Sequence, residues 1–265
     1  MAGTLMINGS KRFEFTGNAL KWIAVVTMLV DHIAAGFYLQ WLGLPEVYAS
    51  PSYNTYCDIY YGMRHIGRMA FPIYCFLLVE GFYHTNSLKR YSLRLLQIAV
   101  LSEIPFDLAL RKGKLDIHYN NVLWELLLGL LVLIAMDYIH NRSDGLFQNE
   151  IVKRVIMVAI MFLGMGLAYL AKLDYKQSGI ACIAVMYFLY GSCKEKRITA
   201  FAVGVLMLTL MSSKSEMYAF AMLLPIYFYD GKRGSNSVAL KRFFYLFYPA
   251  HLLLIYIIRF FILGF

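Results

Sequence analysis

Charge is scarce in this chain. Only 15% of its 265 residues are Asp, Glu, Lys or Arg, whereas about 25% is usual in a soluble domain. Apolar residues make up 60% of the chain and the mean hydropathy is +0.58, which excludes a disordered chain and an ordinary soluble domain. The sequence has no long Pro/Gly/Ser linker, so we expect residues 1–265 to form a single integral-membrane domain.

Cysteine is also sparse, and we expect no metal site. The four cysteines form no CxxC pair, and Cys75 and Cys182 lie in apolar runs where packing is the expected role. The sequence lacks the motifs of phosphate-binding loops, dinucleotide folds, zinc proteases and serine hydrolases. It also lacks the His-x4-Asp box of soluble-type acyltransferases. These absences exclude the enzyme classes that such motifs identify.

The positive charge is distributed as in a membrane protein. The formal net charge is +9, and the basic residues form short clusters between apolar runs instead of one stripe. A stripe would favour nucleic acid, whereas clusters between apolar runs are typical of cytoplasmic loops. We therefore expect membrane lipids, and no nucleic acid, among the partners.

Nine apolar runs are candidate membrane-spanning helices, because about 20 apolar residues cross roughly 30 Å of hydrocarbon. They cover residues 19–38, 66–83, 93–110, 122–139, 152–171, 178–190, 198–211, 216–229 and 243–263. The sixth to eighth runs are short, so tilted or partly re-entrant segments stay open. Loops on the N-terminal side hold roughly twice as many Lys and Arg as the others, which predicts an N-in, C-out orientation. The sequence thus predicts an all-α, polytopic helix bundle in the cell membrane.

Several ionisable side chains lie inside or beside these runs, where an isolated charge costs roughly 2.5–3.5 kcal/mol on insertion scales. In the predicted orientation, the late parts of the first and third runs reach the same depth as the early parts of the second and fourth. We expect a polar chamber at that depth, in the outer half of the membrane. Its predicted lining is Asp31, His32, Arg64, His65, Arg68, Glu103, Asp107, Asn121 and Glu125.

The chamber contains the groups of general-base catalysis. Asp31 and His32 provide a carboxylate and an imidazole that can exchange a proton near neutral pH. Adjacent residues on a helix point about 100° apart, so we expect Glu103 or Asp107 to orient His32. A purely structural interpretation also stays open, in which Arg68 pairs with Glu103 or Asp107 and holds the helices together.

Two further features lie toward the C-terminus. His251 is a strongly polar residue in the early half of the last run, where it could bond a carbonyl group or take part in catalysis. The segment 230–234, with Lys241 and Arg242, could hold an anionic ligand through its cations and backbone N–H groups. Charges that only set the topology explain this segment equally well.

Several stretches in order resemble one known family. They are LKWIA (20–24), DHI (31–33), RHIGRMAFPI (64–73), EGF (80–82), SEIPFD (102–107) and FFYLFYPAHL (243–252). With these stretches the chain resembles the TraX family, multi-pass membrane proteins whose name-giving member is associated with N-terminal acetylation of conjugative pilin. The resemblance extends over nearly the whole chain, and Glu125 departs from the family's pattern.

The resemblance implies an acetyltransferase that takes acetyl-CoA from the cytosol and acetylates an amine or hydroxyl reached from the membrane or the outer face. His32 would be the general base or a transient acyl carrier. The implied catalytic group is Asp31, His32, Glu103 and Asp107. The implied substrate-binding residues are Arg64, His65, Arg68, Asn121 and Glu125. The implied cofactor-binding residues are Lys89, Arg90, Lys232, Arg233, Tyr248 and His251.

Two other functions stay open. A proton-coupled transporter of small solutes could use Asp31, Glu103 or Glu125 in the same chamber. A non-enzymatic membrane partner in secretion or surface assembly would need no chemistry there. The sequence also leaves the acceptor unidentified: a pilin N-terminus, another peptide, a glycan, a lipid head group and a metabolite all fit.

Overall fold

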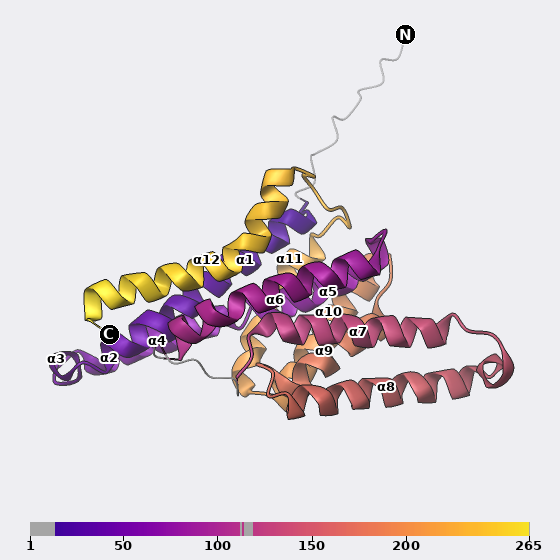
Figure 1. Ribbon diagram of the computed structural model, residues 1–265, viewed down its shortest axis with the longest axis horizontal. Helices are drawn as coiled ribbons and strands as arrows, with labels where there is room; N and C mark the ends of the chain where they lie inside the picture. Colours follow the sequence, from indigo (N-terminus) through magenta and orange to yellow (C-terminus); the bar gives the residue numbers. More distant parts are fainter. Residues whose placement is uncertain (1–13, 112, 114–118, 265) are drawn as a thin grey trace, which may run out of the picture.

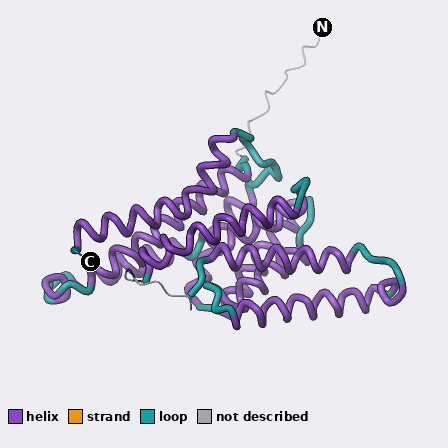
Figure 2. The backbone as a smooth tube through the Cα atoms, viewed as in Figure 1, coloured by secondary structure: helices purple, strands orange, loops and turns teal. Residues whose placement is uncertain are grey.

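The computed structural model describes residues 14–111, 113 and 119–264. In these residues the chain is helical and has no strand beyond two isolated bridges, which confirms the predicted all-α class (Figures 1 and 2). The longer helices are α1 (Gly17–Ile33), α4 (Tyr53–Gly67), α5 (Ala70–His84), α6 (Leu88–Leu110), α7 (Val122–His140), α8 (Glu150–Leu170), α9 (Lys176–Leu189), α10 (Lys194–Met211) and α12 (Val238–Leu263). The shorter elements are the π-helix η1 (Ala34–Tyr38), α2 (Leu39–Leu42), α3 (Pro45–Tyr48), the 3-10 helices η2 (Gly145–Gln148) and η3 (Lys214–Met222), and α11 (Leu223–Tyr227).

Five helical segments of the described chain are long and apolar enough to cross a membrane. They are Gly17–Leu42, Tyr53–His84, Val122–His140, Glu150–Leu170 and Val238–Leu263, and α9 is a shorter apolar helix. Two other predicted runs lie within α6 and α10, which are long enough but carry too many charged residues to join that group. The chain is therefore a helical membrane protein, while the count of nine spans and the N-in orientation stay predictions.

Two of the nine predicted runs differ from the structure in more than a few residues at their ends. The second run begins at Tyr53, because α4 precedes α5 with a break at Arg68 and Met69. The candidate run over 216–229, for which a partly re-entrant form stayed open, is not one continuous α-helix, since its residues lie mostly in η3 and the short α11. Glu216 explains part of this difference: its side chain is fully buried and bonded to Arg68, a long-range contact that hydropathy does not reveal.

The helices form one packed bundle. The main apolar core lies where α5, α7, α9 and α10 meet, and Figure 1 shows α7 and α8 as a long antiparallel pair beside it. A second, smaller apolar cluster joins α1, α6 and α12. The candidate site lies around this second cluster.

The last helix bends where it approaches the site. Pro249 lies inside α12, and the bend is visible in Figure 1. A proline in a helix removes one N–H group and crowds the carbonyl group of the preceding turn. Tyr248, just before the proline, and His251, two residues after it, are both buried.

Candidate active site

A cavity of about 580 Å³ opens beside the amino end of α1. Its walls come from α1, α5, α6, the start of α7, the segment 229–235 and the start of α12. This volume is in the range of about 300–1,000 Å³ that is usual for small-molecule sites. The cavity is therefore large enough to hold a substantial part of a cofactor.

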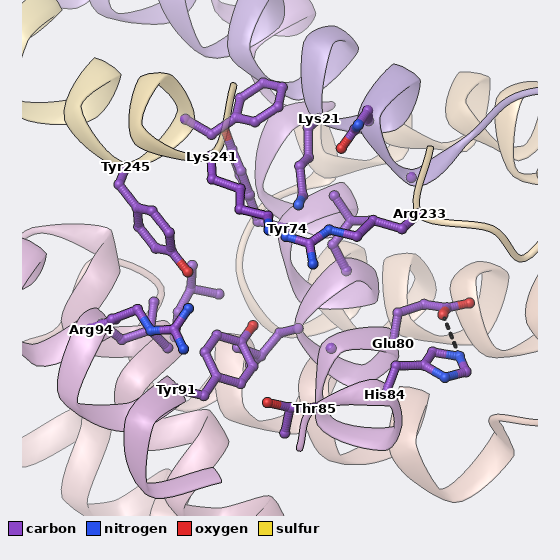
Figure 3. Close-up of a pocket in the computed structure, with 18 of the residues that line it drawn as sticks. Lys21, Tyr74, Glu80, His84, Thr85, Tyr91, Arg94, Arg233, Lys241 and Tyr245 are labelled. Carbon is purple, nitrogen blue, oxygen red and sulfur yellow. Dashed lines mark ion pairs between the residues drawn. The ribbon is translucent and has the colours of Figure 1, made fainter. Parts of the chain in front are cut away.

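Positive charge gathers at one end of the cavity. In Figure 3, the lysine amino groups of Lys21 and Lys241 and the guanidinium group of Arg233 point into the same space, and Arg94 faces it from α6. None of these four side chains forms an ion pair with another described residue. The carboxylate in the same lining, Glu80, is paired with His84 at 3.2 Å. Since crowded like charges repel one another, this end of the cavity favours a ligand with several negative charges.

The fold holds Arg233 in place through its backbone. The Gly17 N–H group donates to the Lys232 carbonyl oxygen at 2.8 Å, and the Asn18 N–H group donates to the Arg233 carbonyl oxygen at 3.0 Å. These are two of the N–H groups that a helix leaves unpaired at its amino end. The chain turns at Gly234, whose backbone φ is +83°. Residues with a side chain rarely adopt this left-handed conformation, whereas glycine adopts it readily. The first turn of α1 and the segment 229–235 therefore form one structural unit.

The other end of the cavity is apolar and ends at a tyrosine. Its lining includes Met28, Leu78, Leu95, Ile98, Leu123 and Leu126. Tyr248 is 5% exposed, and its hydroxyl has no side-chain hydrogen-bond partner among the described residues; its polar neighbour is the backbone of Val122, at the start of α7. The Tyr248 ring lies edge-on to two histidine rings, at 5.9 Å from His32 and 5.8 Å from His251. The apolar end thus reaches Tyr248, whose ring contacts a pair of histidines that lie outside the cavity lining.

The two histidines form a direct hydrogen bond between α1 and α12. His32 Nδ1 lies 2.6 Å from His251 Nε2, and the two rings are parallel within 1°. His251 Nδ1 in turn lies 2.6 Å from the Phe247 carbonyl oxygen. Both histidines are buried, with 9% and 5% of their surface exposed.

We predicted that Glu103 or Asp107 orients His32, whereas the structure places His251 in contact with it. Glu103 accepts hydrogen bonds from Trp124 Nε1, at 2.8 Å, and from the Asn121 side chain. The expectation that Glu103 would orient His32 is wrong, because its carboxylate on α6 instead accepts hydrogen bonds from side chains at the start of α7. Asp107 is buried one turn farther along α6.

Arginines and carboxylates form a network beside the histidine pair. Arg64 donates to Asp31 at 2.8 Å, and Arg68 lies 3.7 Å from Asp31 and 3.0 Å from Glu216. The alternative in which Arg68 pairs with Glu103 is thus replaced by pairs with Asp31 and Glu216. Sequence reasoning missed Glu216 as a site residue, and a carboxylate at the start of an apolar run was the available signal.

The other predicted chamber residues lie in separate contacts. His65 stacks on Tyr218 with ring centroids 4.1 Å apart. Asn121 caps α7 and donates to the Ala99 carbonyl oxygen at 2.9 Å. Glu125 is fully buried near the amino end of α9. The described contacts therefore divide the predicted chamber into a group on α1 and α4, a junction between α6 and α7, and a carboxylate facing α9.

The predicted cofactor residues are partly in the cavity. Arg233 and Tyr248 line it, and His251 is bonded to His32 behind Tyr248. Lys89, Arg90 and Lys232 are exposed and lie outside its lining. Sequence reasoning missed two cations that do line it, Lys21 and Arg94. Lys241, which belongs to the basic segment that we named as a candidate for holding an anionic ligand, lines it as well.

Comparisons with known proteins agree with this picture. Over 266 aligned residues, the chain is 26% identical to a protein named "Probable fimbrial assembly protein FimC, serogroup H1" from Dichelobacter nodosus, with 93% of this chain and 96% of that protein covered. No solved structure matches the chain. The family described as "TraX protein" matches residues 16–259, a range that contains every cavity, histidine and arginine residue described above. The chain belongs to the TraX family.

Proposed function

We propose that this protein is a membrane-embedded acetyltransferase that moves an acetyl group from acetyl-CoA to an acceptor amine or hydroxyl. One observation carries the proposal: a single cavity has unpaired cations at one end and an apolar end closed by Tyr248, which contacts the histidine pair. Acetyl-CoA has the same polarity, since its phosphates lie at one end and its thioester at the end of a long, weakly charged arm. Cationic side chains are the usual partners of phosphates.

The distance along α1 also supports this proposal. Gly17 and His32 are separated by about 22 Å at roughly 1.5 Å per residue, and Lys21 and Met28 line the cavity between them. An extended pantetheine arm could cover such a distance. In the predicted N-in orientation, the cationic end faces the cytosol, where acetyl-CoA is available.

The chemistry that we propose is direct transfer with His32 as general base. The acceptor nitrogen or oxygen attacks the thioester carbonyl carbon while His32 takes the acceptor's proton. The carbon–sulfur bond then breaks, and His32 returns the proton to the departing sulfur, giving acetylated acceptor and CoA. In this proposal Arg64 and Arg68, which are held by Asp31 and Glu216, stabilise the oxyanion or hold the acceptor.

The named relative suggests which acceptor to test first. That protein is called a fimbrial assembly protein, and the TraX family is associated with pilin acetylation. A peptide with the free N-terminal amine of a fimbrial subunit is therefore our first candidate, and hydroxyl acceptors are the second.

The first test of this function is donor binding, with a matched pair of variants. CoA and acetyl-CoA should raise the thermal midpoint of the purified protein in detergent saturably. Arg94→Ala should weaken CoA binding about tenfold, because it removes a contact of the size expected for a charged hydrogen bond, about 1.5 kcal/mol or more. Arg90→Ala is the control, because Arg90 lies one turn earlier on α6, is also exposed and is outside the cavity lining.

Two results would contradict the proposal. One is a thermal midpoint that millimolar CoA does not change, combined with solute uptake driven by a pH gradient, which the transporter alternative predicts. The other is normal acetyl transfer by His32→Ala in a radiolabelled acetyl-CoA assay. We expect that variant to bind CoA normally and to transfer no acetyl group above background.

A further inference from the structure

The hydrogen bond between the two histidines defines a role for the second one. We infer that His251 is a positioning residue that fixes the tautomer and ring orientation of His32, so that His32 presents an unprotonated Nε2. The catalytic meaning of this inference rests on the proposed function. The tautomer itself is a property of the folded protein and can be measured without any substrate.

The argument begins at the Phe247 carbonyl oxygen. A carbonyl oxygen can only accept a hydrogen bond, and it lies 2.6 Å from His251 Nδ1. His251 therefore carries its proton on Nδ1. In a neutral imidazole the other nitrogen is then an acceptor, so His251 Nε2 presents a lone pair.

The second step transfers this constraint to α1. His32 Nδ1 lies 2.6 Å from His251 Nε2, a distance that requires one proton between them. Since His251 Nε2 is the acceptor, His32 Nδ1 is the donor. The remaining nitrogen of His32, Nε2, is therefore left with a lone pair, as a general base requires.

The surroundings favour the neutral form of both rings. Each ring is buried, and burial disfavours the charged form of an imidazole. The charged groups beside them are Arg64 and Arg68, which oppose further positive charge, and Asp31, which is bonded to Arg64. A neutral pair of rings can make both hydrogen bonds, the one between the two rings and the one to the Phe247 carbonyl oxygen, without burying an uncompensated charge.

The last helix supplies the rigid support. His251 bonds to the carbonyl oxygen of its own helix one turn earlier, and its ring stacks on the Phe247 ring at 4.5 Å and 12°. These two contacts lie within α12, so they hold the His251 ring in place without any contact from α1. His251 thus does for His32 what a carboxylate does in many hydrolases, but it adds no negative charge to the bundle.

The decisive measurement is the tautomer of His32. In protein labelled with nitrogen-15 at histidine, we expect the His32 ring to be protonated at Nδ1 and unprotonated at Nε2. The His32→Gln variant identifies the signals, because they disappear from its spectrum. A His32 ring protonated at Nε2 in the unmodified protein would overturn the inference.

Two variants of His251 test the consequence. His251→Phe keeps an aromatic ring and removes the acceptor, and we expect it to lower kcat by about 100-fold, within the usual contribution of general-base catalysis. The KM for acetyl-CoA and the stabilisation by CoA should not change, because His251 lies outside the cavity lining. His251→Gln can place an amide oxygen near the position of Nε2, and it should retain kcat within about tenfold, as expected when one acceptor replaces another.

The outcomes separate this inference from the proposed function. A normal kcat in His251→Phe, or equal losses in the Phe and Gln variants with an unchanged His32 tautomer, would contradict the positioning role. If the protein transfers no acetyl group to any acceptor, the proposed function fails, and the nitrogen-15 spectrum still decides the tautomer. If His251→Phe does not fold, the spectra of the unmodified protein and of His251→Gln give the answer.

Discussion

At the residue scale, two glycines make room for carboxylates, the half-buried Asp31 and the buried Glu125. A Cβ atom on Gly67 would overlap the carboxylate of Asp31, and one on Gly179 would lie 2.5 Å from Oε1 of Glu125. Each carboxylate therefore occupies space that any other residue at the glycine would fill. Close packing of this kind leaves the carboxylate no alternative position.

Gly67→Ala should consequently destabilise the protein and disturb the Arg64–Asp31 pair. We expect a loss of about 1–3 kcal/mol in the free energy of unfolding, the range for overpacked sites. Gly62→Ala is the matched control on the same helix, because nothing lies within 4 Å of its Cβ position. It should be neutral or stabilising by about 0.5–1 kcal/mol. Thermal unfolding in detergent gives both values, and equal midpoints for the two variants would contradict the packing argument.

Tyr248 leads to a prediction in which stability and activity diverge. Its buried hydroxyl has no side-chain partner among the described residues, and its contact with the Val122 backbone falls short of hydrogen-bond geometry, so removing it should cost little free energy of unfolding. Tyr248→Phe should therefore unfold at the same temperature or slightly higher. If the hydroxyl contacts the thioester, kcat should fall by at least about tenfold, the effect of roughly one charge-assisted bond. A less stable variant with normal kcat would show that the hydroxyl is structural.

At the scale of elements, one arginine joins three helical segments. The side chain of Arg259 on α12 is 1% exposed and donates to the carbonyl oxygens of Gly36, Ala109 and Leu108 at 3.2, 2.8 and 2.7 Å. Two of these carbonyls belong to the last turn of α6 and one to η1. A helix end leaves its last carbonyl groups without donors from its own backbone. At the end of α6, the Arg259 guanidinium group provides these donors.

Arg259→Lys should lower stability although it keeps the charge. The lysine amino group lacks the planar fork that reaches several acceptors, and each lost charged bond is worth about 1.5–3 kcal/mol. Arg242→Lys, an exposed position on the same helix, is the control and should leave the thermal midpoint unchanged. A midpoint for Arg259→Lys within error of the control would show that the carbonyls do not depend on the fork.

Much of the fold is predictable from hydropathy, whereas the pairing of side chains is not. The apolar runs predict the positions of most helices, because a helix in a membrane needs a long apolar stretch of sequence. His32 and His251 were recognised as unusual, but their contact joins α1 to α12 across 219 positions. Hydropathy also failed over 216–229, since the buried pair of Arg68 and Glu216 is a tertiary contact. Arg94 falls in the predicted third run, and the sequence does not indicate that it lines a cavity, because its surroundings depend on how α6 packs.

At the scale of the whole molecule, the orientation can be tested with cysteines at opposite ends. Cys193 is exposed just before α10, and the nearby Arg197 guanidinium lies 5.2 Å from the ring of Tyr229, which lines the cavity. Cys193 therefore lies near the cationic end of the cavity, which the N-in prediction places in the cytosol.

In intact cells, a membrane-impermeant maleimide should leave Cys193 unmodified. Asn54→Cys in a Cys57→Ser background should react from outside, because Asn54 is exposed in the first turn of α4. After permeabilisation both cysteines should react. The reverse pattern would contradict the N-in orientation and place the cationic end of the cavity outside the cytosol.

The bond between the Asn18 side chain and the Ser235 carbonyl oxygen joins positions 217 apart in sequence, and it lies beside the backbone bonds that hold Arg233. During translation, the first helix therefore enters the bilayer long before its partners leave the ribosome. A nascent chain cannot assemble the cationic pocket until the segment that carries Ser235 and Lys241 has been synthesised. Polypeptides that stop before this segment should consequently lack the end of the cavity that favours anions.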